Sequence, residues 1–277
     1  MNKGLKAKKP YDIVVLIVMI ILAILFAFPL YWIITGSFKD AAAINAAIPE
    51  WFPHNPTTDN YVRLMEKPAL RWLFNAVFIS VMAMALTCLT AAMAGYALAK
   101  KRFVGQKVLF SIFICAMALP KQVVLVPLLK EMSFLGLHDN MWAVILPTVG
   151  WPFGVFLLKQ FSEGIPTEML EAVRIDGAGE IQTFTTIVLP MIKPGIGALA
   201  IFTFINTWND YFLQLIMLNS SKVLTISLGI AKLQAEMSND FGLIMAGAAL
   251  GAIPIVAIFL MFQKYFTQGI TMGAVKG

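Results

Sequence analysis

Long runs of apolar residues alternate with short polar stretches along this chain. Four of the runs contain no charged residue, and they cover residues 13–34, 72–99, 140–158 and 241–263. A helix needs about 20 apolar residues to cross the hydrocarbon core of a bilayer. Each of the four runs therefore predicts a transmembrane helix.

Two further apolar runs carry one charged residue each. The first, 108–129, contains Lys121 between Pro120 and Pro127, and the second, 195–218, contains Asp210. We count both as membrane helices, interrupted where the charge lies. The pattern predicts an all-α integral membrane protein, with a single transmembrane domain over residues 1–277 and six transmembrane helices. The spans are roughly 12–35, 72–99, 108–129, 140–159, 195–218 and 241–263.

Composition supports a membrane protein. Hydrophobic residues make up 59% of the chain, charged residues only 13%, and the mean hydropathy is +0.80. A soluble domain carries about 25% charged residues. The first span is too long, and lacks the small-residue cleavage site, to be a removable signal peptide.

The distribution of Lys and Arg predicts the orientation. With the N-terminus in the cytoplasm, 13 of the 21 Lys and Arg residues fall on the cytoplasmic side. Both termini and the loop 161–194 are then cytoplasmic, and the loop 36–70 is extracytoplasmic. This cytoplasmic cluster accounts for the net charge of +6, so no nucleic-acid partner is expected.

The loop 161–194 is polar and structured. Pro166 fits the start of a helix, and Glu168 suits the positive end of its dipole. Asp176-Gly177 is a stop signal, because glycine accepts the left-handed conformation at a helix end. We expect a short helix over 167–175, then a second helical run that Pro190 and Pro194 break before the next span.

The same loop carries a spaced motif. It reads Glu171-Ala172-Val173, then Gly177 after three residues, then Ile187, Leu189 and Pro190. This spacing resembles the cytoplasmic "E-A-A loop" of bacterial ABC importer permeases, in a type I importer permease fold. Val173 departs from that pattern, since it replaces the second alanine. By resemblance, the ATPase-coupling residues are Glu171, Ala172, Val173, Asp176, Gly177 and Ala178.

Polar residues also lie inside the fifth span. Asn206, Asn209 and Asp210 share one helix face, and Gln214 extends it by a turn. Two interpretations remain open. They are a polar patch satisfied by neighbouring helices, such as a charge pair with Lys121, or the lining of a translocation path.

Further motifs narrow the resemblance to the carbohydrate-uptake, maltose-type branch of these importers. They are the Trp208-Asn209 pair, the run 176–178 and the C-terminal residues 263–277. The candidate residues for the path or the substrate are Asn206, Trp208, Asn209 and Asp210. Trp208 would join the path only where the helix is broken.

The resemblance implies a non-enzymatic subunit of an ATP-driven, binding-protein-dependent sugar importer in the bacterial cytoplasmic membrane. Its partners would be a second, homologous permease, two ATP-binding cassette ATPases and an extracytoplasmic sugar-binding protein. ATP and magnesium would bind the ATPases, so no cofactor is expected in this chain, and it contains no P-loop lysine motif.

Three other classes stay open as alternatives. An ABC importer for a non-sugar solute would share the loop but lack the Trp208-Asn209 pair. An ion-coupled transporter predicts paired intramembrane charges and inverted repeats. A membrane-embedded enzyme is disfavoured, because no H-E-x-x-H or G-x-S-x-G motif is present. The two cysteines and two histidines show no metal-binding spacing, and no metal site is expected.

Overall fold

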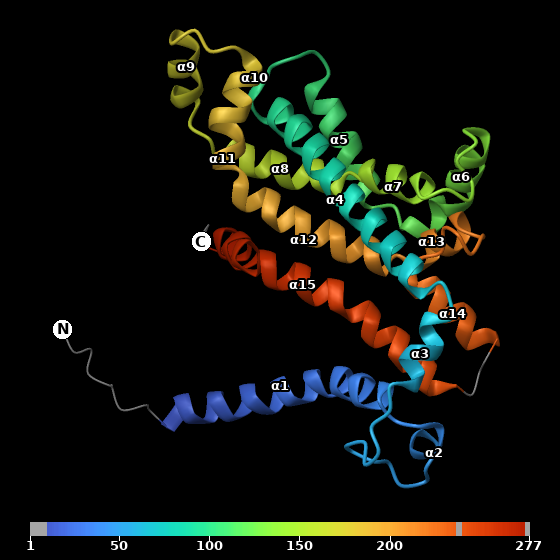
Figure 1. The fold of residues 1–277 in the computed structure, drawn as a ribbon. Helices are drawn as coiled ribbons and strands as arrows, with labels where there is room; N and C mark the ends of the chain where they lie inside the picture. The colour runs from blue at the N-terminus through green and yellow to red at the C-terminus, as the bar shows by residue number, and fades with distance from the viewer. Residues whose placement is uncertain (1–9, 237–239, 275–277) are drawn as a thin grey trace. The chain divides into compact units, whose positions relative to one another are not determined.

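The computed structural model describes residues 10–236 and 240–274, and all regular structure within them is helical. The lysines of the N-terminal tail and the last three residues of the C-terminal motif lie outside this described part. The chain forms two compact units (Figure 1). The first comprises residues up to 67 together with 232–250, and the second comprises 68–231 together with the residues from 251 onward.

The first unit contains three complete helices and parts of two others. α1 (Pro10–Ser37), α2 (Ala41–Ile44) and α3 (Asp59–Met65) are complete. The end of α14 (Ile226–Glu236) and the beginning of α15 (Phe241–Ala274) also belong to it. In this unit the Asn60 amide donates to the carbonyl oxygens of Ser37 and Lys39, and so fixes the turn after α1.

The second unit holds most of the helices. They are α4 (Ala69–Lys100), α5 (Gln106–Met117), α6 (Lys121–Phe134), α7 (Trp142–Val149), α8 (Phe153–Glu163), α9 (Thr167–Ile175), α10 (Glu180–Thr183), the π-helix η1 (Phe184–Val188), α11 (Leu189–Met191), α12 (Lys193–Asn209) and α13 (Tyr211–Met217). α4, α8 and α12 pack together as its centre, and α9 and α10 stand at one end of the unit (Figure 1).

Close packing in this centre depends on small residues. A Cβ atom at Gly95 of α4 would lie 2.7 Å from the Lys159 backbone nitrogen of α8, and one at Gly154 would lie 3.1 Å from the Ala91 Cβ. Small residues allow helix backbones to approach closely where lipid provides no hydrophobic driving force. α4 and α8 therefore meet backbone to backbone, and this contact supports the polar loop that follows α8.

The described helices agree with a polytopic membrane protein and confirm the predicted fold class. Four stretches are long and apolar enough to cross a membrane, namely Tyr11–Ser37, Ala69–Lys100, Trp142–Glu163 and Phe241–Gln263. Two bent helix pairs would raise the count to six if each pair is one broken span. They are Gln106–Met117 with Lys121–Phe134, bent by 107°, and Glu180–Met191 with Lys193–Asn209, bent by 75°.

The two spans that carry a charge are not continuous helices. The run 108–129 is divided between α5 and α6, with Pro120 at the break. The run 195–218 is divided between α12 and α13, with Asp210 at the break. Proline lacks a backbone donor and disfavours a helical conformation at the residue before it, which accounts for the first break.

Candidate functional site

α9 begins and ends at the residues predicted from the sequence, Thr167 and Ile175. Gly177 has a φ of +83°, so the predicted left-handed helix end is confirmed. Its N–H donates to the Arg174 carbonyl at 3.0 Å, and the Ala178 N–H donates to the Val173 carbonyl at 3.1 Å. These two bonds form a Schellman motif, which satisfies the last carbonyls of the helix.

One side of α9 is anchored in the protein. Leu170 is only 5% exposed and belongs to a core cluster whose members come from α4, α8, α9, η1, α12 and the turn before α9. Its members are Ala91, Ala92, Tyr96, Leu158, Ile165, Leu170, Val188, Ile192 and Leu199. Burying a leucine side chain contributes about 1.5–3 kcal/mol, so this contact fixes which side of α9 faces outward.

The outward side carries acidic and apolar residues together. Glu168, Glu171, Ala172 and Ile175 lie at helical spacing, and all four are exposed. We call these four residues the α9 stripe. Ile175 is 86% exposed, and Ile181 at the start of α10 is 81% exposed. Large branched apolar side chains therefore stand uncovered beside the charges of this loop.

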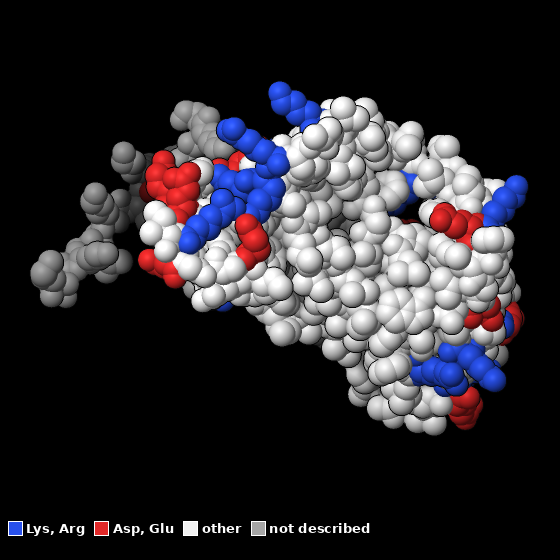
Figure 2. All heavy atoms as spheres, turned by 90° about the horizontal axis from the view of Figure 1, so that it is seen from above, with Lys and Arg blue, Asp and Glu red and all other residues white. Residues whose placement is uncertain are grey.

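Charged side chains brace the segment after α9. Glu180 pairs with Lys101, which follows α4, and with Arg174 of α9 at 3.1 Å. The hydrogen bond from Lys101 and the charges of Lys101 and Arg174 hold the pKa of Glu180 below its ordinary value, against the opposing effect of burial. Charged residues gather at this end of the second unit, beside an almost uncharged surface (Figure 2).

The last residue of α4 holds the segment before α9. Lys100 donates to the carbonyl oxygens of Glu163 and Ile165, at 3.1 and 2.6 Å. Two neighbouring lysines at the end of α4 thus bind the segments on either side of α9, Lys100 the segment before it and Lys101 the segment after it.

The second helical run ends between Pro190 and Pro194, the two prolines predicted to break it before the next span. Pro190 lies in the first turn of α11, where its missing N–H leaves no hydrogen bond unmade. The bend comes at Ile192, and Pro194 occupies the first turn of α12. The π-helix η1 precedes this bend, and sequence periodicity gave no indication of it.

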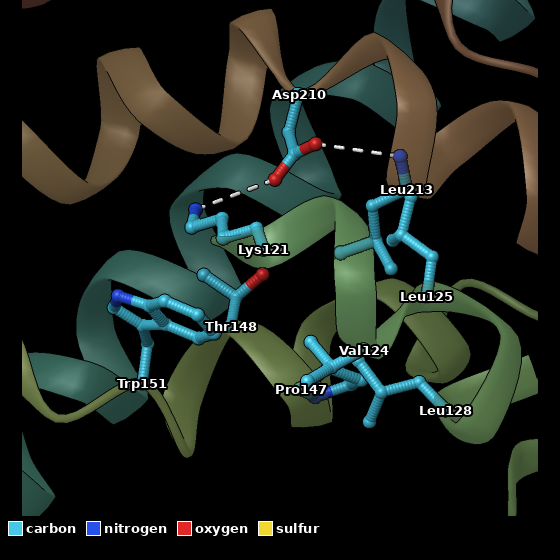
Figure 3. Close-up of a pocket in the computed structure, with 9 residues that line it drawn as sticks. All are labelled: Lys121, Val124, Leu125, Leu128, Pro147, Thr148, Trp151, Asp210 and Leu213. Carbon is cyan, nitrogen blue, oxygen red and sulfur yellow. Dashed lines mark hydrogen bonds and ion pairs between the residues drawn. The ribbon is translucent and has the colours of Figure 1, made fainter. Parts of the chain in front are cut away.

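Asp210 lies at the junction of two helices. Its φ and ψ of −78° and 68° end α12, and its side chain accepts from the Leu213 N–H at 3.3 Å to cap α13. The other carboxylate oxygen lies 3.4 Å from Lys121 Nζ, at the beginning of α6 (Figure 3). The two interrupted spans therefore meet at an ion pair, as the charge-pair interpretation anticipated.

Two small cavities, each of about 30 Å³, adjoin this pair. The first contains both charged side chains and has apolar walls (Figure 3). The second contains Lys121 and is lined by Thr87, Thr203 and Asn206 among others. Lys121, Thr148 and Trp151 line both, and the Lys121 ammonium lies 5.2 Å from the centre of the Trp151 ring.

The residues that the sequence proposes for the path differ in their surroundings, because some line a cavity or are exposed and others are buried. Asn206 lines the second cavity, and Asn209 is exposed. Trp208 is 5% exposed and stacks on Phe204, so in this conformation it contributes to packing. Gln214 is buried and bonded to the Thr207 carbonyl and the Thr225 hydroxyl, so extending the polar face to it was wrong. The broken helix turns it elsewhere.

Thr87, Thr148 and Trp151 are cavity residues that the sequence did not single out. The Thr87 hydroxyl is buried and has no hydrogen-bond partner in the structure. The sequence indicates a polar lining here only through Thr87 itself, a threonine inside the charge-free run 72–99. This indication is weak, because a threonine within a helix commonly bonds to its own helix backbone.

Comparison with known proteins fits this geometry. The family described as "Binding-protein-dependent transport system inner membrane component" matches residues 88–272. The arabinooligosaccharides transport system permease protein AraQ of Halalkalibacterium halodurans is 34% identical over 92% of this chain and 93% of its own length. The trehalose/maltose transport system permease protein MalG of Thermococcus litoralis is 32% identical over 96% and 97%.

A solved structure has the same fold. A chain of a bacterial ABC transporter involved in alginate import superposes with a TM-score of 0.83 at 22% identity, covering 95% of this chain and all of that one. The apolar helices, the loop with its Gly177 helix end and these matches agree. This chain therefore belongs to the family of binding-protein-dependent ABC importers, as a membrane-embedded permease subunit.

Proposed function

We propose that this permease imports sugars, in the oligosaccharide range or as related polyols and glycosides. The support is that its relatives carry names that state arabinooligosaccharides, trehalose/maltose and maltodextrin as their cargo. The observation that carries the coupling role is α9, a helix with one anchored side and one exposed stripe.

The α9 stripe would sit in a cleft on an ATPase subunit. Glu171 and Ile175 would make the contact, while Gly177 fixes the end of the helix and Leu170 its rotation. Two such ATPases would bind ATP and magnesium, and their closure would move α9 together with α4 through Lys100 and Lys101. ATP hydrolysis would then be converted into alternating access without catalysis by this chain.

Other surfaces suit the remaining partners. Residues 11–30 of α1 are all exposed, which fits contact with lipid or with a second, homologous permease. The loop 36–70 would receive sugar from an extracytoplasmic binding protein. Both termini would lie in the cytoplasm of a bacterial cell.

The translocation path would pass the ion pair. Asn206, Asn209 and Asp210 would exchange hydrogen bonds with sugar hydroxyls, and Trp208 would reach the path only after α12 and α13 rearrange. Amide and carboxylate groups match hydroxyl donors and acceptors well. Interrupted helices at substrate sites are common in transporters.

Uptake by the complete complex tests the proposal. The permease would be assembled in proteoliposomes with a second permease, an ATPase and a binding protein from the same organism. ATP-dependent uptake of labelled arabinotriose, maltotriose and raffinose would be measured. We expect uptake of at least one sugar, and uptake of none of them would instead favour a non-sugar solute.

Glu171→Lys tests the docking role in the same assay. The variant places a cation within the α9 stripe, so we expect assembled transporter whose sugar uptake falls at least tenfold. Glu131→Lys on α6 is the matched control, since Glu131 is an exposed acidic residue far along the chain from α9. Equal uptake by the two variants would remove the docking assignment.

A further inference from the structure

We infer that the Lys121–Asp210 ion pair sets the charge selectivity of this permease, by keeping the space between its interrupted spans electrically neutral. The pair would admit neutral sugars and exclude sugar acids. This inference rests on the proposed sugar transport and specifies the substrate class of the same site.

The first support is the charge inventory of the two cavities. Among the residues that line them, Lys121 and Asp210 are the only charged ones, and they carry opposite charges. The remaining lining is apolar or carries hydroxyl, amide and indole groups. A ligand in the first cavity therefore meets both members of a compensated pair, and a ligand in the second meets Lys121, whose charge Asp210 balances from the first.

The second support is accessibility. The Lys121 side chain is 41% exposed and the Asp210 side chain 18%, so the pair faces open space and is not sealed in the core. The separation of 3.4 Å is longer than a typical charge-assisted hydrogen bond. Both charges can thus be reached by a ligand, and each would dominate its surroundings if the other were removed.

The third support is an unused hydrogen-bonding group. The Thr87 hydroxyl is buried, lacks a partner and belongs to the lining of the second cavity. Buried hydroxyls nearly always have a partner. Thr148 donates to the Val144 carbonyl at 2.8 Å, which leaves its hydroxyl oxygen as an acceptor toward the same space. With the flat face of Trp151, these groups suit an uncharged polyhydroxylated ring.

The volume of the cavities explains when such a ring could enter. Each cavity offers about 30 Å³ of water-accessible volume, which is room for a few water molecules. A sugar ring is larger, so it would enter only after the spans move apart. Lys121, Thr148 and Trp151 line both cavities, so a movement of the Lys121 side chain would join them into one groove.

Removing one charge should change the selectivity in a predictable direction. Asp210→Asn would leave the Lys121 ammonium without its partner in the lining of both cavities, where it would attract carboxylates. Lys121→Gln would leave a lone carboxylate, which repels acids and attracts amino sugars. The double variant Lys121→Gln/Asp210→Asn would be neutral again.

The test measures selectivity in the assembled transporter. The probes are the neutral sugar that the wild type imports, and digalacturonate as the acidic sugar. Both sugars are offered at fixed ionic strength. One series of measurements omits the binding protein, and a second series adds it at a saturating concentration. The readout is the uptake of the neutral sugar divided by the uptake of digalacturonate. Where transport is slow, the readout is how strongly each of the two sugars competes with the other for uptake.

We expect this ratio to fall about tenfold in Asp210→Asn, to stay high or rise in Lys121→Gln, and to return to the wild-type value in the double variant. Lys130→Gln is the matched control, because Lys130 lies on the same helix as Lys121 and lines neither cavity. Its ratio should equal that of the wild type.

A further variant keeps the inference testable where a broken pair prevents assembly. Thr148→Lys adds a cation to both cavities with the pair intact, and it should lower the ratio, whereas Thr148→Gln should not. An unchanged ratio in Asp210→Asn or in Thr148→Lys, with sugar still imported, would overturn the inference. A wild-type complex that imports none of the sugars would instead overturn the proposed function.

Discussion

The left-handed conformation of Gly177 gives a quantitative prediction about coupling. A Cβ atom built at Gly177 meets nothing within 4 Å, so substitution there introduces no steric clash with neighbours. The whole effect comes from the backbone, whose φ is +83°. For a residue with a Cβ atom this conformation costs about 1–2 kcal/mol, and a β-branched residue is disfavoured further.

A cost of that size would unravel the end of α9 in part of the molecules. A free energy of 1–2 kcal/mol corresponds to a factor of about 5–30 in an equilibrium constant. We expect Gly177→Ala to lower sugar uptake about fivefold and Gly177→Val to lower it further. Gly177→Asn should stay within about twofold of the wild type, because asparagine tolerates the left-handed region.

The assay is the ratio of ATP hydrolysed to sugar imported by the reconstituted complex, which should rise as the end of α9 loosens. Gly179 provides the matched control. It is also exposed and has nothing near a built Cβ atom, but its φ is −73°. Gly179→Ala should therefore leave the ratio unchanged within about twofold. If Gly177→Ala and Gly179→Ala behaved alike, the backbone explanation would be refuted.

Two further predictions concern other parts of the second unit. Asp139, with a φ of 58°, accepts from the N–H groups of Asn219 and Ser220 at 2.8 and 2.9 Å. Asp139→Ala should thus lower the free energy of unfolding by about 1–2 kcal/mol in a thermal unfolding assay. Burial raises the pKa of Asp139, but these hydrogen bonds outweigh it and hold the pKa below its ordinary 3.8. Ionised Asp139 therefore stabilises the fold above pH 3.8. The difference in the free energy of unfolding between the wild type and Asp139→Asn should shrink as the pH falls below 3.8. A difference that grows in acid would contradict the stabilising role of the Asp139 carboxylate. After both native cysteines are changed to alanine, Asn206→Cys should react with a water-soluble thiol reagent and Thr207→Cys, buried at 1%, should not; equal labelling would show that Asn206 does not line the path.

Sequence reasoning was most accurate where local chemistry decides the conformation. The start of α9 at Thr167 and its end before Gly177 follow from a proline, an acidic first turn and a glycine within a few residues. These features need no knowledge of the rest of the fold.

The departures occur where distant segments decide the conformation. Asp210 ends a helix because its carboxylate is used by the Leu213 N–H and by Lys121, which is 89 positions away in the chain. No local pattern encodes that encounter. Gln214 turns from the path because α13 starts anew at Asp210, and its amide then bonds with Thr207 and Thr225, 7 and 11 positions away.

The contacts of Lys100 and Lys101 with the segments before and after α9 have a consequence for protein engineering. Residues 161–194 look like a cassette that could be exchanged between importers to redirect a permease to another ATPase. Their attachment points, however, lie outside the cassette, at the end of α4. A chimera that receives the loop without matching residues at 100 and 101 would carry the correct docking helix without its contacts to α4. Transplanting the two lysines together with the loop should restore these contacts and, with them, the coupling of ATP hydrolysis to transport.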